Sequence, residues 1–343
     1  MPTRDRLIVL AALSAGALIV GAELLITAVA LPAIVADLAG WTELRRASWI
    51  VNGYALTFIA AMPLAGRAAD RFGLARLFTL SLVVFAFGSL LSGAAQDLDQ
   101  LIAARLIQGI GAGAVVPLAT AGASHLFDGV GRARALGVVG ACTFLGMALG
   151  PFGGAFILET FDLTALFAGG TGSASLLATL TVPAWRWIFY VGAPLAVLVL
   201  AYTWAAAPTW PRPAERTSLD LLGAGLSTAA LAAGLLTLTR LGEQDAQADA
   251  LFGPIPLAVA TLVLMAAAAV RNLRAKQPFL DLNLLRNRTF SAAVVLSLLT
   301  GYALATAIIG AAVFIDRVRY AGPAEQRLVL GSLGLAMALG ALG

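Results

Sequence analysis

The sequence is poor in the residues that build catalytic and metal-binding sites. Its 343 residues include one cysteine, Cys142, and one histidine, His125. A single cysteine excludes an internal disulfide framework and a cysteine-based metal site. We find no HExxH pattern, no Ser–His–Asp set and no nucleotide-binding loop. We therefore expect that the protein is not an enzyme and that it holds no metal and no cofactor.

Charge is scarce as well. Charged residues make up 12% of the chain and hydrophobic residues 60%, and the mean hydropathy is +0.91. Soluble globular domains typically carry about 25% charged residues. The net charge of +4 does not indicate nucleic acid as a partner, because the basic residues lie between apolar stretches and form no patch. The composition predicts a protein whose surroundings are a lipid bilayer.

Apolar runs near the ~20 residues that cross a bilayer recur along the whole chain. The first run is too long for the hydrophobic segment of a secretory signal, which has about 7–15 residues, so we expect it to remain as a membrane helix. The pattern predicts an all-α, polytopic protein of about ten transmembrane helices. They are placed at residues 7–35, 47–66, 75–95, 100–124, 133–157, 186–206, 219–241, 250–271, 288–315 and 326–343.

The connections between these helices alternate between two sides, and their charge predicts the orientation. One side carries fourteen Lys and Arg residues and the other seven, while Arg105 falls inside a span. The positive-inside rule places the more basic side in the cytoplasm. We expect a multi-pass protein of the inner or plasma membrane with a cytoplasmic N-terminus.

Two connections differ from the short turns elsewhere. Residues 158–184 form a long external segment rich in Gly, Ser and Thr, in which the apolar stretch Leu163–Ala168 is too short to span the membrane. Residues 208–218 are rich in proline and charge, which indicates a linker and the best internal domain boundary.

Two charged residues lie well inside the predicted spans, away from their ends. Glu23 is near the middle of the first helix, where a charged carboxylate is costly and functional roles are common. It is interpreted as a proton carrier or a counter-charge for a cationic substrate, and the alternative is a structural hydrogen bond. Arg105 shares a face of the fourth helix with Gln108 and Gly109. It is interpreted as a gating residue, and the alternative is an arginine that extends outward to the membrane surface.

The fifth predicted helix carries small residues at a regular spacing. Gly146, Gly150 and Gly154 recur every four residues, and Pro151 lies between them. Such a face lets another helix approach closely, and proline bends a helix. This pattern favours a surface on which two helix bundles rock against each other. Tight packing in a static bundle is the alternative.

The connection between the second and third helices, residues 66–76, is basic but contains Asp70. The carboxylate is flanked by arginines, so it could pair with them or with a helix N-terminus and hold one conformation closed. A charged turn without further function is the alternative. The residues of this predicted cytoplasmic gating loop are Gly66, Asp70, Arg71, Gly73 and Arg76.

Taken together, six stretches of the chain resemble motifs of the major facilitator superfamily, and within it of the drug:proton antiporters with fourteen spans. They are residues 23–32, 66–76, 101–113, 146–154, 185–189 and 277–290, in the order of the family. The chain departs from the family pattern at Glu23, where Asp is more typical, and at Leu74, Ala75 and Ala155. The segment 158–184 is longer than the family pattern.

The resemblance implies a six-helix N-terminal bundle at 1–207, a linker and inserted helix pair at 208–271, and the beginning of a second bundle at 272–343. Since Gly343 falls inside the tenth predicted span, we expect a C-terminally truncated chain. The implied function is secondary active transport, namely proton-coupled multidrug efflux of amphiphilic or cationic compounds. Glu23 would exchange protons, Arg105 would assist coupling, and small molecules and protons would be the partners. A metabolite facilitator of the same fold and a membrane protein without transport activity are the alternatives.

Overall fold

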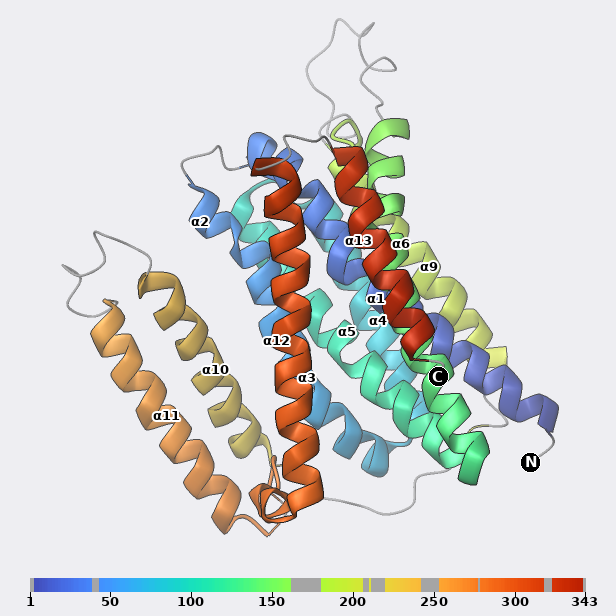
Figure 1. Cartoon of the computed structure of the whole chain (residues 1–343), viewed down its shortest axis with the longest axis vertical. Helices are drawn as coiled ribbons and strands as arrows, with labels where there is room; N and C mark the ends of the chain where they lie inside the picture. Colours follow the sequence, from blue (N-terminus) through green and yellow to red (C-terminus); the bar gives the residue numbers. More distant parts are fainter. Residues whose placement is uncertain are drawn as a thin grey trace, which may run out of the picture. The chain divides into compact units, whose positions relative to one another are not determined.

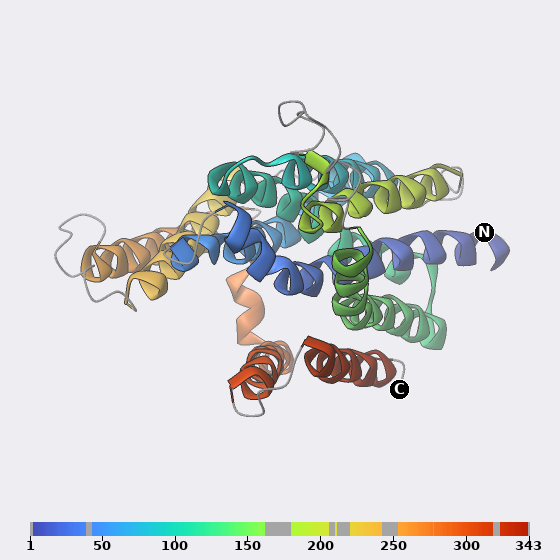
Figure 2. The same ribbon diagram turned by 90° about the horizontal axis from the view of Figure 1, so that it is seen from above.

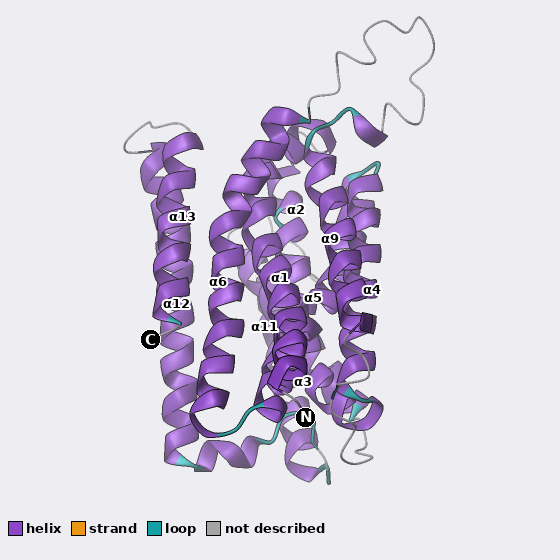
Figure 3. Cartoon of the chain, turned by 90° about the vertical axis from the view of Figure 1, so that its right-hand side faces the viewer, coloured by secondary structure: helices purple, strands orange, loops and turns teal. Residues whose placement is uncertain are grey.

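The computed structural model describes residues 3–38, 43–161, 180–205, 210, 220–241, 253–276, 278–317 and 323–341. These residues form helices, turns and loops, and no strand occurs among them (Figure 3). The described chain forms two compact units. The first comprises Met1–Arg216 with Leu330–Gly343, and the second comprises Thr217–Val329. The predicted division at residues 207 and 271 stays a prediction.

The first unit is a bundle of long apolar helices (Figure 1). Its elements are α1 (Thr3–Leu38), the short α2 (Leu44–Ala47), α3 (Trp49–Phe72), α4 (Leu74–Ala94), α5 (Leu98–Leu126), α6 (Gly129–Thr160) and α9 (Trp185–Ala205). Short connections join α3 to α4, α4 to α5 and α5 to α6. The Asp97 side chain, for example, caps α5 by accepting a hydrogen bond from the N–H of Gln100 at 2.8 Å.

Helix α5 lies at the centre of this unit and contacts α1, α3, α4 and α6. Helix α1 packs along α6 (Figure 2) and also contacts α9. Two clusters of buried apolar side chains fill the interior. One surrounds Leu13, Phe78 and Leu118, and the other surrounds Ile34, Ile50 and Phe189. The polar residues described below lie on the same helices as these two clusters.

The second unit contains α10 (Leu221–Leu241), α11 (Pro254–Arg274), the 3₁₀ turn η4 (Leu282–Arg286) and α12 (Arg288–Arg317). Helices α10 and α11 pack on each other, and the hydroxyls of Thr237 and Thr261 are hydrogen-bonded across the pair at 3.2 Å. Helix α13 (Pro323–Gly340) belongs to the first unit from Leu330 onward.

The predicted all-α fold with about ten helices is confirmed. Eight of the described helices are long and apolar enough to cross a membrane, namely α1, α3, α4, α5, α6, α9, α10 and α11. The long segment 158–184 includes the end of α6, but its apolar stretch Leu163–Ala168 lies outside the described residues. The linker 208–218 also lies outside them, except for Trp210, whose ring packs 5.7 Å from that of Phe78.

One predicted boundary is wrong. The second predicted helix was to end at residue 66, but α3 continues to Phe72, so Gly66, Asp70 and Arg71 are helical. Gly73 alone separates α3 from α4, with φ 92°, a conformation that costs glycine little. Arg71 in the last turn also suits the negative end of the helix dipole. The expected gating loop is therefore one glycine between two helices, with Arg76 in the first turn of α4.

Candidate functional site

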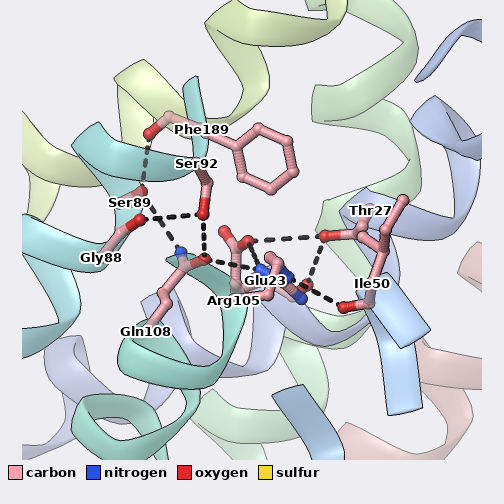
Figure 4. Close-up of polar contacts among 9 residues, drawn as sticks. All are labelled: Glu23, Thr27, Ile50, Gly88, Ser89, Ser92, Arg105, Gln108 and Phe189. Atoms are coloured by element: carbon pink, nitrogen blue, oxygen red, sulfur yellow. Dashed lines mark hydrogen bonds and ion pairs between the residues drawn. The ribbon is translucent and has the colours of Figure 1, made fainter. Parts of the chain in front are cut away.

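The two charged residues predicted within the spans meet each other in the first unit. The carboxylate of Glu23 on α1 accepts a hydrogen bond from Nη1 of Arg105 on α5 at 2.6 Å (Figure 4). The side chains are 4% and 1% exposed. Both residues stand out in the sequence, but their contact does not, because they are far apart along the chain.

Gln108 on the same helix and two further helices, α3 and α9, hold the Arg105 guanidinium. Its Nη1 also donates to Oε1 of Gln108 at 2.6 Å, and its Nε donates to the carbonyl of Ile50 on α3 at 3.2 Å. The guanidinium carbon lies 4.0 Å from the ring centroid of Tyr54 and 5.5 Å from that of Phe189, an arrangement that favours a cation. The arginine is therefore held inside the bundle and does not extend to the membrane surface.

A chain of neutral groups continues the network onto α4 and α9. Gln108 Nε2 donates to the hydroxyl of Ser89 at 3.3 Å, and that hydroxyl donates to the carbonyl of Phe189 at 2.7 Å. The hydroxyl of Ser92 donates to Gln108 Oε1 at 3.4 Å. On the opposite side, Thr27 donates to the carboxylate of Glu23 at 3.5 Å. Together these contacts join α1, α3, α4, α5 and α9 (Figure 4).

Glycine makes the approach of these helices possible. A methyl group at Gly109 would lie 2.5 Å from the carbonyl oxygen of Tyr54, and one at Gly88 would lie 2.5 Å from the backbone nitrogen of Gln108. Both distances are shorter than van der Waals contact. The predicted motif residue Gly109 therefore allows α3 to pack directly on the helix that carries Arg105.

The glycine face of α6 packs on α1, the helix that carries Glu23. A methyl group at Gly150 would lie 2.5 Å from the Ala22 carbonyl oxygen, and one at Gly146 would overlap the backbone of Leu18. Gly154 faces Ile26, whereas Gly153 on the other side of the helix has open space. Pro151 is buried within α6, which runs on through it. The predicted glycine face of α6 thus packs against the backbone of α1 both before and after Glu23.

The predicted gating residues lie elsewhere. Asp70, Arg71 and Arg76 are exposed, and none of them contacts the Glu23–Arg105 pair. Within the described residues no ion pair joins Asp70 to either arginine. The site residues thus form two groups, a buried network in the bundle and an exposed α3–α4 corner at Gly73.

A second buried arginine stands in the motif at 185–189. Arg186, at the start of α9, is 2% exposed. Its Nη1 donates to the carbonyls of Gly93, at 2.8 Å, and Ala95 at the end of α4. Trp185 donates to Asp37 on α1 at 3.0 Å. The motif at 185–189 was the signal for this cluster, which joins the ends of three helices.

The described residues contain no group of three or more His, Cys, Asp or Glu side chains placed to hold a metal ion. The chemistry of the site is therefore that of an ion pair within hydrogen-bonding neighbours. Such a pair can open when the carboxylate takes up a proton, because protonation removes the charge that binds the arginine.

The profile of the Major Facilitator Superfamily matches residues 13–343. A triacylglyceride transporter of Mycolicibacterium hassiacum is 33% identical over 300 residues, which are 88% of this chain and 52% of that protein. A triacylglyceride transporter of Mycobacterium tuberculosis H37Rv is 30% identical over 303 residues, 88% of this chain and 54% of that protein. The chain spans about half the length of the curated relatives it matches.

Solved transporter structures share the fold. The proton:xylose symporter XylE superposes with a TM-score of 0.61 at 15% identity, covering 99% of this chain and 69% of that one. A bacterial homolog of the human lysosomal transporter Spinster superposes with a TM-score of 0.54 at 18% identity, covering 100% and 75% of the two chains.

Proposed function

The chain belongs to the major facilitator superfamily, and from this premise we propose that it exports a lipid-like, uncharged substrate such as a triacylglyceride in exchange for protons. It is a multi-pass membrane transporter and not an enzyme. The direction of transport, the substrate and the coupling ion are the proposal. So is the cytoplasmic position of the N-terminus, which rests on the uneven distribution of Lys and Arg.

The buried Glu23–Arg105 pair is the observation that carries proton coupling. Breaking a buried pair leaves an uncompensated charge that costs roughly 3–5 kcal/mol. Proton uptake by Glu23 removes that cost, so the protonated bundle is free to adopt a second arrangement while the deprotonated one keeps α1 tied to α5. A proton gradient could then bias the two conformations that alternating access needs.

The same pair favours an uncharged substrate over a cation. Glu23 is already neutralised by Arg105, so a cationic compound would have to displace a guanidinium that is held by a carboxylate, an amide and two aromatic rings. The names of the mycobacterial relatives agree with a lipid substrate. Multidrug efflux is the second candidate, supported by the carboxylate itself, which would attract a cation if Arg105 moved away.

The α3–α4 corner and the α6 glycine face have supporting roles in this proposal. Gly73 would serve as a hinge between α3 and α4 on the cytoplasmic side, with Asp70, Arg71 and Arg76 as its exposed charges. Gly146, Gly150 and Gly154 would let α1 slide on α6 when the ion pair opens.

The test is transport by purified protein in liposomes with an imposed pH gradient. Export of a fluorescent triacylglyceride and of a cationic dye should be measured for the wild-type protein and for Glu23→Gln. We expect gradient-driven triacylglyceride movement that Glu23→Gln abolishes. Dye movement without triacylglyceride movement would favour multidrug efflux, and unchanged transport by Glu23→Gln would reject Glu23 as the coupling residue.

A further inference from the structure

A groove of about 770 Å³ runs along the α10–α11 pair of the second unit. Its walls are mostly aliphatic, with Leu231 and Leu238 from α10 and Leu262 and Met265 from α11, and Leu280 lines it near η4. Ligand-binding cavities commonly measure about 300–1,000 Å³. Because both helices are candidate membrane spans, the groove lies at a depth where hydrocarbon chains surround the protein.

The shape and polarity of the groove suit an acyl chain. Along α11 it extends from Ala258 to Asn272, about 21 Å at 1.5 Å per residue, which exceeds the ~15 Å of one hydrocarbon leaflet. The hydroxyls of Thr237 and Thr261 bond to each other at 3.2 Å and to carbonyls of their own helices. They therefore present little unsatisfied polarity to the groove.

Several cations lie close in the chain to Asn272, at one end of the groove, although none of them lines it. Asn272 lines it and fixes the chain beyond α11 by accepting a hydrogen bond from the N–H of Leu280 at 2.9 Å. Within about one turn of Asn272 lie the half-exposed Arg271 and the exposed Arg274 and Lys276. Arg271 uses Nε and Nη2 to bind Asp220 at 3.1 and 2.8 Å, and Nη1 takes no part in that pair. Two further exposed cations, Arg286 and Arg288, follow at η4.

We propose that this groove binds an anionic phospholipid, with an acyl chain along α10 and α11 and the phosphate at Arg274 and Lys276. Basic clusters at the ends of membrane spans attract anionic headgroups, and the groove beside this cluster supplies the apolar half of the same ligand. The site lies within the second unit and is separate from the Glu23–Arg105 pair, so it does not depend on which substrate is transported.

The experiment uses the purified protein in detergent micelles and a phosphatidylglycerol with a photoactivatable group on its acyl chain. Binding is measured by titration, and adducts are located by mass spectrometry of peptides. Three variants are compared with wild type. Arg274→Gln with Lys276→Gln removes the headgroup contacts, and Gly234→Leu narrows the groove, where a Cβ would lie 3.5 Å from Thr261. Arg132→Gln with Arg134→Gln removes two exposed cations of the first unit as a matched control.

We expect adducts in peptides 227–238 and 258–272 that phosphatidylglycerol competes away and phosphatidylcholine does not. The Arg274/Lys276 variant should weaken binding about tenfold or more, Gly234→Leu should reduce the adducts, and the Arg132/Arg134 control should change binding less than twofold. Equal competition by phosphatidylcholine or by a triacylglyceride would overturn the proposal. So would adducts confined to the first unit, or an equal loss of binding in the control.

Discussion

Each unit of the protein contains an arginine bound to a carboxylate, and the two pairs differ in their access to water. In the first unit, Glu23 and Arg105 are 4% and 1% exposed and lie within candidate membrane spans. In the second, Asp220 is 3% exposed but its partner Arg271 is 40% exposed, and the pair lies where α10 begins and α11 ends. Water can solvate an exposed charge when its ion pair breaks, whereas a buried charge has no solvent to replace its partner.

The second pair has a structural role that the first lacks. Asp220 Oδ1 accepts the N–H of Gly223 at 3.0 Å and so caps α10 while it also binds Arg271 on α11. The pair fastens the ends of two helices. The first pair lies within its helices and caps neither end, and the proposed proton coupling would explain why it is buried there.

Arg105→Ala should be the most damaging change. It leaves the carboxylate of Glu23 buried without its cation, which should lower the free energy of unfolding by about 3–5 kcal/mol. Denaturant titration in detergent measures this. Glu23→Leu combined with Arg105→Met removes both charges and should recover most of the stability but no transport. A double variant that transports, or a single variant of wild-type stability, would show that the pair is not the coupling element.

Gly150→Leu should disturb α1 through its backbone. A side chain there collides with the Ala22 carbonyl, and overpacking typically costs about 1–3 kcal/mol. Gly153→Leu is the matched control, because its Cβ would meet open space. Both the thermal unfolding temperature and the transport rate should be lower in Gly150→Leu than in wild type. If the two variants behave alike, the α1–α6 contact does not position Glu23.

Asp220→Asn should weaken the second unit by about 1 kcal/mol, since asparagine still caps a helix but cannot bind Arg271 as an anion. Unlike Arg105→Ala, it should leave coupling unchanged. Normal coupling with lowered thermal stability is the expected result. Loss of proton-driven transport in a variant that still folds would remove the distinction between the two pairs.

The Asp220 pair also predicts a pH dependence. Burial alone would raise the pKa of the Asp220 carboxyl, but the hydrogen bonds from Arg271 and from the Gly223 N–H outweigh it, and the pKa lies below its ordinary value of 3.8. The stabilisation is therefore complete above that value and is lost as the pH falls through the lowered pKa. The free energies of unfolding of wild type and Asp220→Asn should therefore differ at pH 7 and become equal at acid pH. If the difference in unfolding free energy between the two proteins were the same at both pH values, it could not come from the ionised Asp220 carboxylate.

Arg46→Gln should have the smallest effect. Arg46 binds Asp99 where both side chains are largely exposed, 48% and 71%, and such pairs contribute about 0–1 kcal/mol. Neither unfolding nor transport should change measurably. A large loss would mean that exposure does not set the strength of the ion pairs in this protein.

The helical fold was predictable because apolar runs of membrane length leave few other structures possible. The apolar run does not reveal the end of α3. The charged stretch Arg67–Arg71 resembles a loop in the sequence, although its residues form helices readily. Only the structure shows that Gly73 by itself reverses the chain.

The site residues were predictable one by one, but their contacts were not. Glu23 and Arg105 stand out because charges within membrane spans are rare. Their pairing depends on how α1 packs against α5, which no spacing within either helix reveals. Arg186 was overlooked because at the edge of a span an arginine resembles an ordinary connecting cation.

Proton release by the purified protein would show whether Glu23 exchanges a proton for substrate. A triacylglyceride and, separately, a cationic dye are added in weakly buffered detergent, and the released protons are followed with a pH-sensitive indicator. If Glu23 exchanges a proton for substrate, one of the two compounds releases protons from the wild type and none from Glu23→Gln. Equal release by both proteins would place the proton on another residue and leave the Glu23–Arg105 pair a structural contact.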